Sequence, residues 1–301
     1  MRAAITGASG FVGSALTYHL LAAGDEVVSL ARVDGGPDLV DRRAVFEAVG
    51  DHRVEVVYHL GAQSHVPTSW DDPITTLRVN VEGTQNVIDA AHALDVAPRV
   101  IVASSAEVYG AVERKRLPID EAHPLRPNNP YAASKVAADA VALQAWLGRQ
   151  QDVIRARAFN HIGPGQNPKF VCAGLAKRIA QAESTGVSEI EVGNLDVRRD
   201  FCDVRDVVAA YRLLATSGRS GEAYNVCTGI DRPIRELAEG LANLSTIDCQ
   251  FVTNPDLLRP VDSPVVRGNN AKLVEHTEWQ PKIPLADTLA DVLALAREAQ
   301  Q

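Results

Sequence analysis

The chain begins Met1-Arg-Ala-Ala-Ile-Thr-Gly-Ala-Ser-Gly-Phe-Val-Gly13, a short apolar segment that runs directly into three glycines. An amphipathic pattern over residues 15–23 follows at once and predicts a helix. Gly7 permits a tight turn, Gly10 lets backbone amides approach a pyrophosphate, and Gly13 lets the helix pack close to the strand. The spacing is G-x-x-G-x-x-G rather than G-x-G-x-x-G. This stretch therefore predicts a dinucleotide-binding turn between a strand and a helix.

Composition narrows the class of protein. The chain has 301 residues, of which 46% are hydrophobic, enough to bury one large domain or two closely packed ones. The net charge of −8 and the lack of a clustered basic run argue against a nucleic-acid surface. No apolar run is long enough to span a membrane, and the strand-forming residues after Met1 leave no room for a signal peptide. We therefore expect a globular, cytoplasmic protein that binds neither nucleic acid nor membranes.

The cysteines give no sign of a metal site or of disulfides. They are scattered and show no C-x-x-C spacing. In a cytoplasmic protein we expect four reduced thiols and no metal. The residues concerned are Cys172, Cys202, Cys227 and Cys249.

The first half of the chain alternates β-branched runs with helical patterns. This alternation is typical of βαβ units, so we predict an α/β fold with a Rossmann-type, doubly wound parallel sheet. Because little sequence separates the second strand from the next, one strand usual in such sheets is expected to be short or missing. Strands are expected at residues 26–32, 54–60, 99–104, 153–159 and 223–227, and helices at residues 44–50 and 73–94.

From residue 160 onward the pattern becomes irregular and richer in Gly, Pro and Asn. We interpret this part as a smaller α/β substrate-binding domain that is interleaved with the first. Residues 1–159 plus about 203–230 are assigned to the dinucleotide-binding domain, and residues from about 160–202 and 231–301 to the substrate-binding domain.

The end of the second expected strand bears on the choice of cofactor. An acidic residue there typically hydrogen-bonds the ribose of NAD, whereas a basic residue accommodates the 2′-phosphate of NADP. Here the strand ends Ser29-Leu30-Ala31-Arg32, with Asp34 close behind. Arg32 favours NADP(H), and the nearby Asp34 keeps NAD(H) as the second choice.

Two reactive side chains share one helix face in Tyr131-Ala-Ala-Ser-Lys135. A phenol with a pKa of about 10 exchanges protons poorly at neutral pH, and a nearby cation favours the phenolate. Lys135 is therefore expected to lower the pKa of Tyr131. The apolar strand ending at Ser104-Ser105 supplies a hydroxyl where open α/β sheets place ligands. These three residue types predict a catalytic set of Ser105, Tyr131 and Lys135.

Several motifs together resemble the extended short-chain dehydrogenases/reductases that modify nucleotide sugars. The similarity spans essentially the whole chain. It is carried by residues 6–13, His59-Leu-Gly-Ala-Gln63, Asn80-Val-Glu-Gly-Thr84, residues 104–110, Tyr131-Ala-Ala-Ser-Lys135 and Arg157-Ala-Phe-Asn-His-Ile-Gly-Pro-Gly165.

Later segments are similar to the branch of that family whose members reduce or dehydrate GDP-linked sugars. Epimerases acting on UDP-sugars usually lack the Gly-Asn-Leu-Asp stretch, so the resemblance implies a GDP-sugar substrate. The segments are Phe159-Asn-His161, Val192-Gly-Asn-Leu-Asp-Val-Arg-Arg-Asp-Phe201, Arg259-Pro260, Asn225-Val-Cys-Thr-Gly229 and Asn269-Asn-Ala-Lys-Leu273.

The resemblance implies a role for each matching residue. Tyr131 would donate a proton to the C4 oxygen of the sugar while NADPH delivers hydride to C4. Lys135 would bind the nicotinamide ribose, and Ser105 would steady the carbonyl. The implied cofactor residues are Gly7, Gly10, Phe11, Val12, Gly13, Arg32, Asp38, Leu39, Leu60, Ala62, Tyr131, Lys135, Phe159 and His161.

The implied substrate residues include two arginines that would clamp the diphosphate by charge-assisted hydrogen bonds. The alternative for either arginine is a solvated surface charge, and for Phe159 and Phe170 it is ordinary core packing. The implied set is Ser105, Glu107, Asn160, Phe170, Val171, Lys177, Arg199 and Arg259.

Glu107 bears on the choice between a reductase and a dehydratase. Dehydratases of this group use such a carboxylate to remove the C5 proton, and the preceding residue often helps to expel water. Here that residue is Ala106, which can neither donate nor accept a proton. The compact chain also resembles the reductase, so we favour reduction of GDP-4-keto-6-deoxy-D-mannose to GDP-D-rhamnose. A dehydratase or epimerase that uses Glu107 is the alternative, and a non-catalytic NADP-binding regulator is a remote one.

Two helical patterns, at residues 73–94 and 131–148, suggest how the chain assembles. Relatives use this helix pair to form a four-helix dimer interface, and two-fold dimers dominate among soluble oligomers. We therefore expect a homodimer. The apolar residues considered for this interface are Val87, Ala91, Val136, Ala140 and Leu143.

Overall fold

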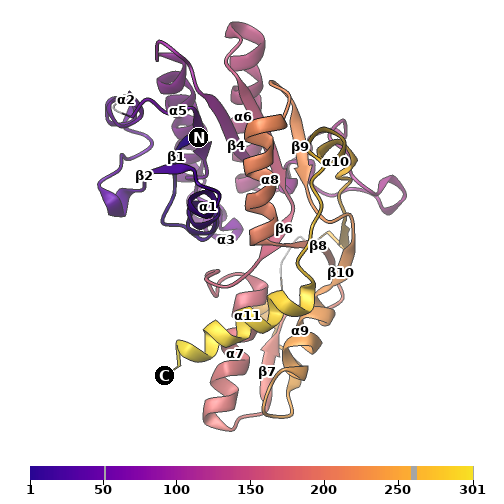
Figure 1. Ribbon diagram of the computed structural model, residues 1–301. Helices are drawn as coiled ribbons and strands as arrows, with labels where there is room; N and C mark the ends of the chain where they lie inside the picture. Colours follow the sequence, from indigo (N-terminus) through magenta and orange to yellow (C-terminus); the bar gives the residue numbers. More distant parts are fainter. Residues whose placement is uncertain (51, 259–262, 301) are drawn as a thin grey trace.

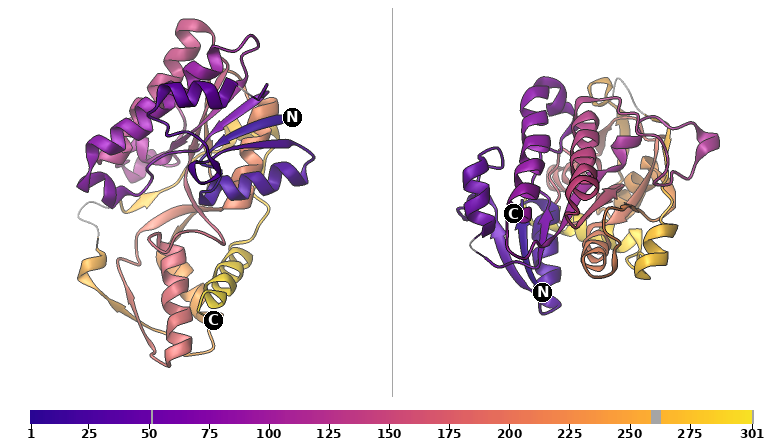
Figure 2. Two further views of the ribbon diagram at one scale, coloured as in Figure 1. Left: turned by 90° about the vertical axis from the view of Figure 1, so that its left-hand side faces the viewer. Right: turned by 90° about the horizontal axis from the view of Figure 1, so that it is seen from above.

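The computed structural model describes residues 1–50, 52–258 and 263–300. Figures 1 and 2 show a central sheet with its helices in the upper part of the view and a second group of helices and short strands below it. The N-terminus lies at the sheet, and the C-terminus lies in the lower group.

The central sheet confirms the predicted fold class. Six parallel strands are hydrogen-bonded in the order β2-β1-β3-β4-β5-β9. Strand order reverses direction between β1 and β3, the place where open α/β sheets bind ligands at their carboxyl ends. The strand β2 forms one edge of this sheet, so the strand expected to be short or missing has no counterpart among the described residues. The strands are β1 (Arg2–Thr6), β2 (Glu26–Leu30), β3 (Val56–His59), β4 (Arg99–Ser105), β5 (Val153–Ala158) and β9 (Ala223–Val226).

Helices bury both faces of the sheet, as a doubly wound fold requires. On one face, Leu16 of α1 and Tyr211 of α8 belong to one apolar core with sheet residues. On the other face, Val45 of α2, Val87 of α5 and Ala142 of α6 belong to another. These helices are α1 (Phe11–Ala22), α2 (Arg42–Gly50), α5 (Gly83–His92), α6 (Pro130–Arg149) and α8 (Val204–Ser217).

Two of the expected element boundaries are wrong. The strand β2 ends at Leu30, so Arg32 starts the 3₁₀ turn η1 (Arg32–Asp34) instead of ending a strand. The expected helix over residues 73–94 is interrupted: α4 (Pro73–Leu77) leads into the π-helical turn η2 (Arg78–Glu82) before α5 begins. A π-helical turn widens a helix locally and occurs often at functional sites.

The π-helical turn is stabilised by a buried amide. The Oδ1 of Asn80 accepts a hydrogen bond from the backbone N–H of Gln63 at 2.8 Å. Its Nδ2 donates to the Oγ of Ser134 on α6 at 2.8 Å. Asn80 thereby links the segment after β3 to the helix that carries Tyr131.

The second group of elements has its own apolar core, which is formed mainly by three helices. The helices are α7 (Val171–Thr185), α9 (Ile234–Asn243) and α11 (Leu285–Glu298). The strand β8 (Arg198–Asp203) pairs with β6 (Asn160–Ile162), β10 (Asp231–Pro233) and β12 (Val265–Val266), and β7 (Glu189–Val192) pairs with β11 (Gln250–Thr253). The division of the chain into two interleaved domains at the expected boundaries stays a prediction.

The remaining short elements are α3 (Val66–Asp71), α10 (Ala271–Thr277), η3 (Ala106–Tyr109), η4 (Arg114–Arg116) and η5 (Pro255–Leu257). All four cysteines are free thiols. Over the described ranges, no helix combines the length and the apolar character needed to cross a bilayer.

The residues considered for a dimer interface differ in exposure. Val87 and Ala91 are fully buried in the core beside the sheet, so the interpretation of these two as interface residues is wrong. Ala140 is exposed on α6 and Leu143 is half-buried. Exposed apolar side chains near this helix pair include Trp70 of α3, Ile74 and Leu77 of α4 and Leu147 of α6.

Candidate functional site

The glycine turn after β1 is closed so tightly that side chains cannot fit. A Cβ on Gly13 would lie 2.1 Å from the carbonyl oxygen of Gly7. Gly7 has a φ of +69°, and a Cβ there would lie 2.9 Å from the backbone of Gly61, which follows β3. Gly10 closes the turn by donating its N–H to the carbonyl oxygen of Gly7 at 3.0 Å. The roles expected of Gly7 and Gly13 in the turn and in close helix packing are thus confirmed.

The N-terminus of α1 fits a dinucleotide diphosphate. No side chain caps it, because Gly10 is the N-cap residue, and its first turn carries no acidic residue. The N–H groups of a first helical turn have no partner within the helix and attract anions. Phe11 and Val12 begin this helix, and the ring of Phe11 stacks on that of His161 with centroids 6.0 Å apart.

His161 is held in the neutral form. Burial lowers its pKa more than the hydrogen bond from its Nδ1 to the carbonyl oxygen of Phe159, at 3.0 Å, raises it. Phe159 itself is buried in a cluster with Val108, Tyr109 and Cys227, so it packs in the core.

Arg32 is an exposed cation at the carboxyl end of β2. Its Nη1 lies 3.4 Å from Oδ2 of Asp38, and three quarters of its side chain is accessible. Asp34, which left the choice of cofactor open, accepts a hydrogen bond from the Oγ of Ser29 at 2.6 Å. Arg32 therefore remains available to an anionic group at this edge, which fits the 2′-phosphate of NADP.

Leu39 lies directly over the ends of β1 and β3. Its Cδ1 would be 2.7 Å from a Cβ on Gly61, and its carbonyl oxygen accepts from Nδ2 of Asn86 at 2.8 Å. Leu60 and Ala62 follow β3 and are half-buried. The expected cofactor residues from the ends of β1, β2 and β3 are thus placed along the same edge of the sheet.

Tyr131 and Ser105 lie next to each other. Ser105 ends β4, and its hydroxyl is near enough to the phenol of Tyr131, in the first turn of α6, to lower the pKa of that phenol. Burial raises the pKa of Tyr131 to about 12; the Ser105 hydroxyl opposes this effect, and the carboxylate of Glu107 adds to it. The expectation of a lowered pKa is wrong, because burial of the phenol outweighs the other effects.

Lys135 lies one turn beyond Tyr131, but its ammonium is directed elsewhere. The Nζ donates to the carbonyl oxygen of Ala103 at 2.8 Å. Burial lowers the pKa of Lys135 to about 8. The two residues share a helix face as expected, yet Lys135 is not among the groups that shift the pKa of Tyr131.

The Glu107 carboxylate is hydrogen-bonded to the N-cap residue of α6, the helix that carries Tyr131 and Lys135. Its Oε2 accepts from Nδ2 of Asn129 at 3.1 Å, and Asn129 caps α6 by accepting from the N–H of Ala132 at 2.7 Å. The backbone N–H of Glu107 donates to the Oγ of Ser105 at 3.2 Å. The structure therefore brings Ser105, Glu107, Tyr131 and Lys135 together at the end of β4.

The expected substrate residues are more dispersed. Asn160 is exposed on β6, Lys177 is exposed on α7, and Val171 is the first residue of α7. Phe170 is the N-cap residue of α7, and its ring meets the edge of His65 with centroids 6.1 Å apart. Their contact with a sugar nucleotide stays a prediction.

Arg199 is buried in β8. Its Nη1 donates to the carbonyl oxygens of Arg198 at 2.8 Å and Ser263 at 2.7 Å. The interpretation of Arg199 as a solvated surface charge is therefore wrong. Arg259, the other expected diphosphate ligand, lies outside the described residues.

Two contacts at the catalytic helix were missed by the sequence reasoning. The Oγ of Ser69 in α3 accepts from the backbone N–H of Tyr131 at 3.1 Å. Asp139, one turn beyond Lys135, binds Ser104 and two arginines of β5. A further i+4 step from Lys135 could have pointed to Asp139, whereas nothing in the sequence pattern singles out Ser69.

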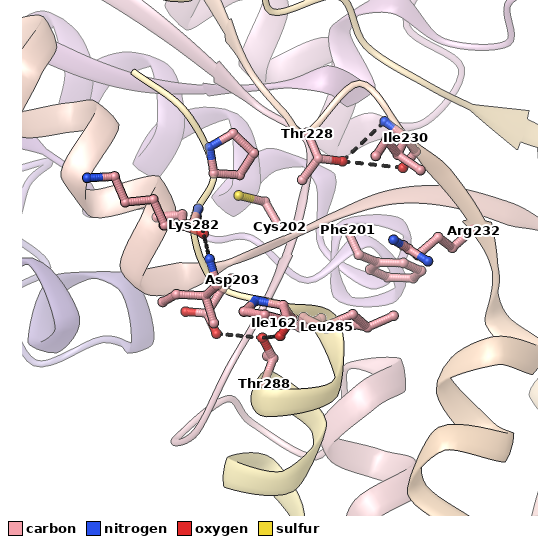
Figure 3. Close-up of a pocket in the computed structure, with 14 residues that line it drawn as sticks. Ile162, Phe201, Cys202, Asp203, Thr228, Ile230, Arg232, Lys282, Leu285 and Thr288 are labelled. Carbon is pink, nitrogen blue, oxygen red and sulfur yellow. Dashed lines mark hydrogen bonds between the residues drawn. The ribbon is translucent and has the colours of Figure 1, made fainter. Parts of the chain in front are cut away.

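A cavity of about 220 Å³ lies in the second group of elements. Figure 3 shows it between β8, β10 and the chain that enters α11, with Cys202, Asp203, Arg232 and Lys282 in its wall. Ser105, Tyr131 and Lys135 do not line it, so this cavity is separate from the catalytic set.

Residues 3–227 match the NAD dependent epimerase/dehydratase family. The chain is 39% identical to the GDP-6-deoxy-D-mannose reductase of Pseudomonas aeruginosa over 294 residues, 96% of this chain and 95% of that protein. The structure of RMD from Pseudomonas aeruginosa complexed with NADPH has a TM-score of 0.89 and 36% identity, covering 99% of this chain and 100% of that one. The Thermus thermophilus UDP-glucose 4-epimerase complex with NAD has a TM-score of 0.86 and 28% identity, with coverage of 99% and 100%. Together with the glycine turn and the proximity of Ser105 and Tyr131, these matches show that the chain belongs to the NAD dependent epimerase/dehydratase family.

Proposed function

We propose that this chain is a nucleotide-sugar reductase that uses NADPH, and less readily NADH, to reduce the C4 ketone of GDP-4-keto-6-deoxy-D-mannose to GDP-D-rhamnose. Similarity to a GDP-6-deoxy-D-mannose reductase extends over nearly the full length of both chains. The similar structure named RMD holds NADPH. The uncapped N-terminus of α1 and the exposed Arg32 suit the two anionic parts of that cofactor.

The full-length similarity to a GDP-6-deoxy-D-mannose reductase carries this proposal, and the protonated state of Tyr131 agrees with it. A reductase starts from a protonated donor, whereas a dehydratase or epimerase first oxidises C4 and needs the phenolate as a base. With a pKa raised to about 12, the buried phenol of Tyr131 keeps its proton at neutral pH. The site is therefore ready to donate a proton, as reduction of a ketone requires.

The proposed reaction adds one hydride and one proton across the C4 carbonyl. NADPH, when bound, supplies the hydride and becomes NADP⁺. Tyr131 donates its phenolic proton to the C4 oxygen, and the Ser105 hydroxyl hydrogen-bonds the same oxygen as negative charge develops on it. Solvent then returns a proton to the Tyr131 phenolate, and Lys135 would bind the nicotinamide ribose of the cofactor. The ketone is reduced to a secondary alcohol.

Dehydration of GDP-mannose is the second candidate. It is favoured by Glu107, whose carboxylate acts on the pKa of Tyr131 and is attached to the N-cap of the catalytic helix. It is weakened by Ala106, which offers no second proton donor beside that carboxylate.

A paired assay separates the two activities. Purified protein is given NADPH with GDP-4-keto-6-deoxy-D-mannose, and in a second reaction GDP-mannose without added reductant. Stoichiometric NADPH oxidation with the keto sugar alone supports the reductase. Loss of water from GDP-mannose without net cofactor change would reassign the protein as a dehydratase.

The variant Tyr131→Phe tests the proton donor in the same assay. We expect kcat to fall by about 10²- to 10⁴-fold, because the proton must then come from water. NADPH binding, measured by the fluorescence of the nicotinamide, should persist. Full turnover in this variant would exclude Tyr131 as the donor.

Three further parts of the proposal concern the domains, the oligomeric state and the cellular location of the protein. Residues 1–159 and about 203–230 would bind the cofactor, and the rest would bind the GDP-sugar. The chain would form a homodimer, with exposed apolar residues of α4 and α6, such as Ile74 and Leu147, at the interface. It would act in the cytoplasm. Sedimentation velocity of Ile74→Glu against the unmodified chain tests the interface.

A further inference from the structure

A buried ionic cluster lies directly behind the catalytic helix. Asp139 of α6 is 1% exposed, and its carboxylate is shared by two arginines of β5. The Nη1 of Arg155 donates to Oδ1 of Asp139 at 2.8 Å. Arg157 donates from Nε to Oδ2 at 2.9 Å and from Nη2 to Oδ1 at 3.0 Å. Burial alone would raise the pKa of Asp139, but the guanidinium groups outweigh burial and hold it below its ordinary value, so the carboxylate stays charged.

The same carboxylate also reaches the end of β4. The Oγ of Ser104 donates to Oδ2 of Asp139 at 2.9 Å. Residues 103 to 105 thereby each face one residue of α6: Ala103 accepts from Lys135, Ser104 donates to Asp139, and the Ser105 hydroxyl lies near the phenol of Tyr131. The three helix residues are spaced by four and so follow one face. Strand and helix are thus joined at three points, and only the points at Tyr131 and Lys135 belong to the catalytic set.

The cluster extends to the turn that carries Glu107. The Nη1 of Arg157 donates to the phenolic oxygen of Tyr109 at 3.0 Å, and that phenol donates to Oδ1 of Asn225 at 2.7 Å. Tyr109 ends η3, the turn that begins one residue after Ser105. Arg157 and Asn225 belong to sequence motifs for which the catalytic set gives no role, and this chain of contacts gives them one.

We propose that Asp139, linked to β4 through Ser104, is a positioning residue that fixes the register of α6 against the end of β4. A shift of the helix along its axis would move the phenol of Tyr131 away from Ser105 and the ammonium of Lys135 away from Ala103. A displacement of about 1 Å can cost about 100-fold in rate even when no reacting group is lost. The inference rests on the proposed reductase function.

The variant Ser104→Ala tests the inference without disturbing the two arginines. We expect kcat to fall about tenfold, because α6 loses the contact of Asp139 with β4. KM for the sugar and Kd for NADPH should not change, since Ser104 is buried and its hydroxyl is bonded to Asp139. Ser104→Thr, which keeps the hydroxyl donor, should restore kcat.

Ser220→Ala is the matched control. Ser220 donates to Asp152 at 2.5 Å, and Asp152 also accepts from Arg99 at 2.9 Å. Because Arg99 is the first residue of β4, this Ser–Asp–Arg cluster lies at the opposite end of the strand. The control loses the same kind of hydrogen bond. It should lower Tm as much as Ser104→Ala does but leave kcat unchanged. A purely structural role of Ser104 would make the two variants alike.

Hydrogen exchange gives a second measurement that does not need turnover. The peptide covering residues 130–139 should exchange faster in Ser104→Ala than in Ser220→Ala. Asp139→Asn should show the larger effect, with kcat lower by about 100-fold if it folds. Equal kcat and equal exchange in the two serine variants would overturn the positioning role, as would a rise in KM alone. If the unmodified chain does not reduce the keto sugar, the proposed function fails, and the exchange result alone decides the inference.

Discussion

The proposed cofactor side and the proposed sugar side of the candidate site differ in the contacts that position their residues. On the cofactor side, Gly7, Gly10 and Gly13 form a turn whose main contacts lie within a few residues. On the side proposed to bind the sugar, Arg199 donates to a carbonyl 64 positions away, at Ser263. The neighbouring Asp200 accepts from the N–H of Gly268, 68 positions away. A local motif builds the first, and only the folded chain assembles the second.

This difference predicts that mutations will separate the two sides. A change in the glycine turn should weaken cofactor binding first, and a change near Arg199 should weaken sugar binding first. The following experiments test that separation, and they are ordered from the largest expected effect to the smallest.

Gly13→Ala should have the largest effect on the cofactor side. A Cβ at this position would lie 2.1 Å from the carbonyl oxygen of Gly7, so α1 must move away from β1. We expect loss of detectable NADPH binding by fluorescence titration and a free energy of unfolding lower by about 1–3 kcal/mol. Gly50→Ala at the end of α2 is the control, because no described atom lies within 4 Å of its Cβ. Unchanged NADPH affinity in Gly13→Ala would contradict the close packing of the turn.

Asp200→Asn should act on the sugar side. The buried carboxylate accepts from the N–H and hydroxyl of Thr228 and from the N–H groups of Gly229 and Gly268. An amide keeps only one acceptor oxygen, so these loops loosen around Arg199. We expect KM for the GDP-sugar to rise about tenfold, and Kd for NADPH to stay the same.

The control for this variant is Asp196→Asn. Asp196 is in the same segment but four fifths exposed, paired with Arg235 at 2.9 Å. Its replacement should leave both ligands unaffected, because exposed ion pairs contribute little. A parallel loss of cofactor affinity in Asp200→Asn would show that the two sides are coupled rather than separate.

Arg32→Ala should change the choice of cofactor. The exposed guanidinium lies at the end of β2, with Asp38 as its partner at 3.4 Å. We expect KM for NADPH to rise about tenfold while KM for NADH is unchanged, because only NADPH carries the 2′-phosphate. Arg43→Ala, which removes an exposed charge from α2, controls for net charge. A similar rise for both cofactors would argue against a phosphate contact.

Lys135, whose ammonium contacts Ala103 at the end of β4, should produce the most gradual effect. Burial lowers its pKa from 10.5 to about 8, so between these pH values the unfolded chain binds more protons than the folded chain. Stability therefore rises with pH in that window, by at most about 1.4 kcal/mol per unit. Urea unfolding at several pH values should show this slope relative to Lys135→Met, which lacks the titrating group. Equal slopes would mean that the ammonium is not buried.

The core of the site could be predicted from sequence because its signals are local. The glycine spacing, the serine-ended strand and the Tyr131–Lys135 pair each lie within a few residues, and the structure places them where the periodicity indicates. The interruption of residues 73–94 by a π-helical turn was not predictable, because Asn80 makes its contacts with Gln63 and Ser134, which are distant in sequence. Local helical propensity does not report such partners.

The sequence by itself determined the alternation of strands and helices in the central sheet, the glycine turn and the proximity of Ser105, Tyr131 and Lys135, whose catalytic roles stay a prediction. These depend on side-chain periodicity and on backbone freedom at glycine, which act over a few residues. Tertiary structure decided the protonation state of Tyr131, the burial of Val87 and Ala91, and the cluster around Asp139. Each of these depends on how deeply a group is buried and on which charges from distant segments surround it. Burial reversed the expected direction of the Tyr131 pKa, since removing a phenolate from water costs more than one nearby hydroxyl returns.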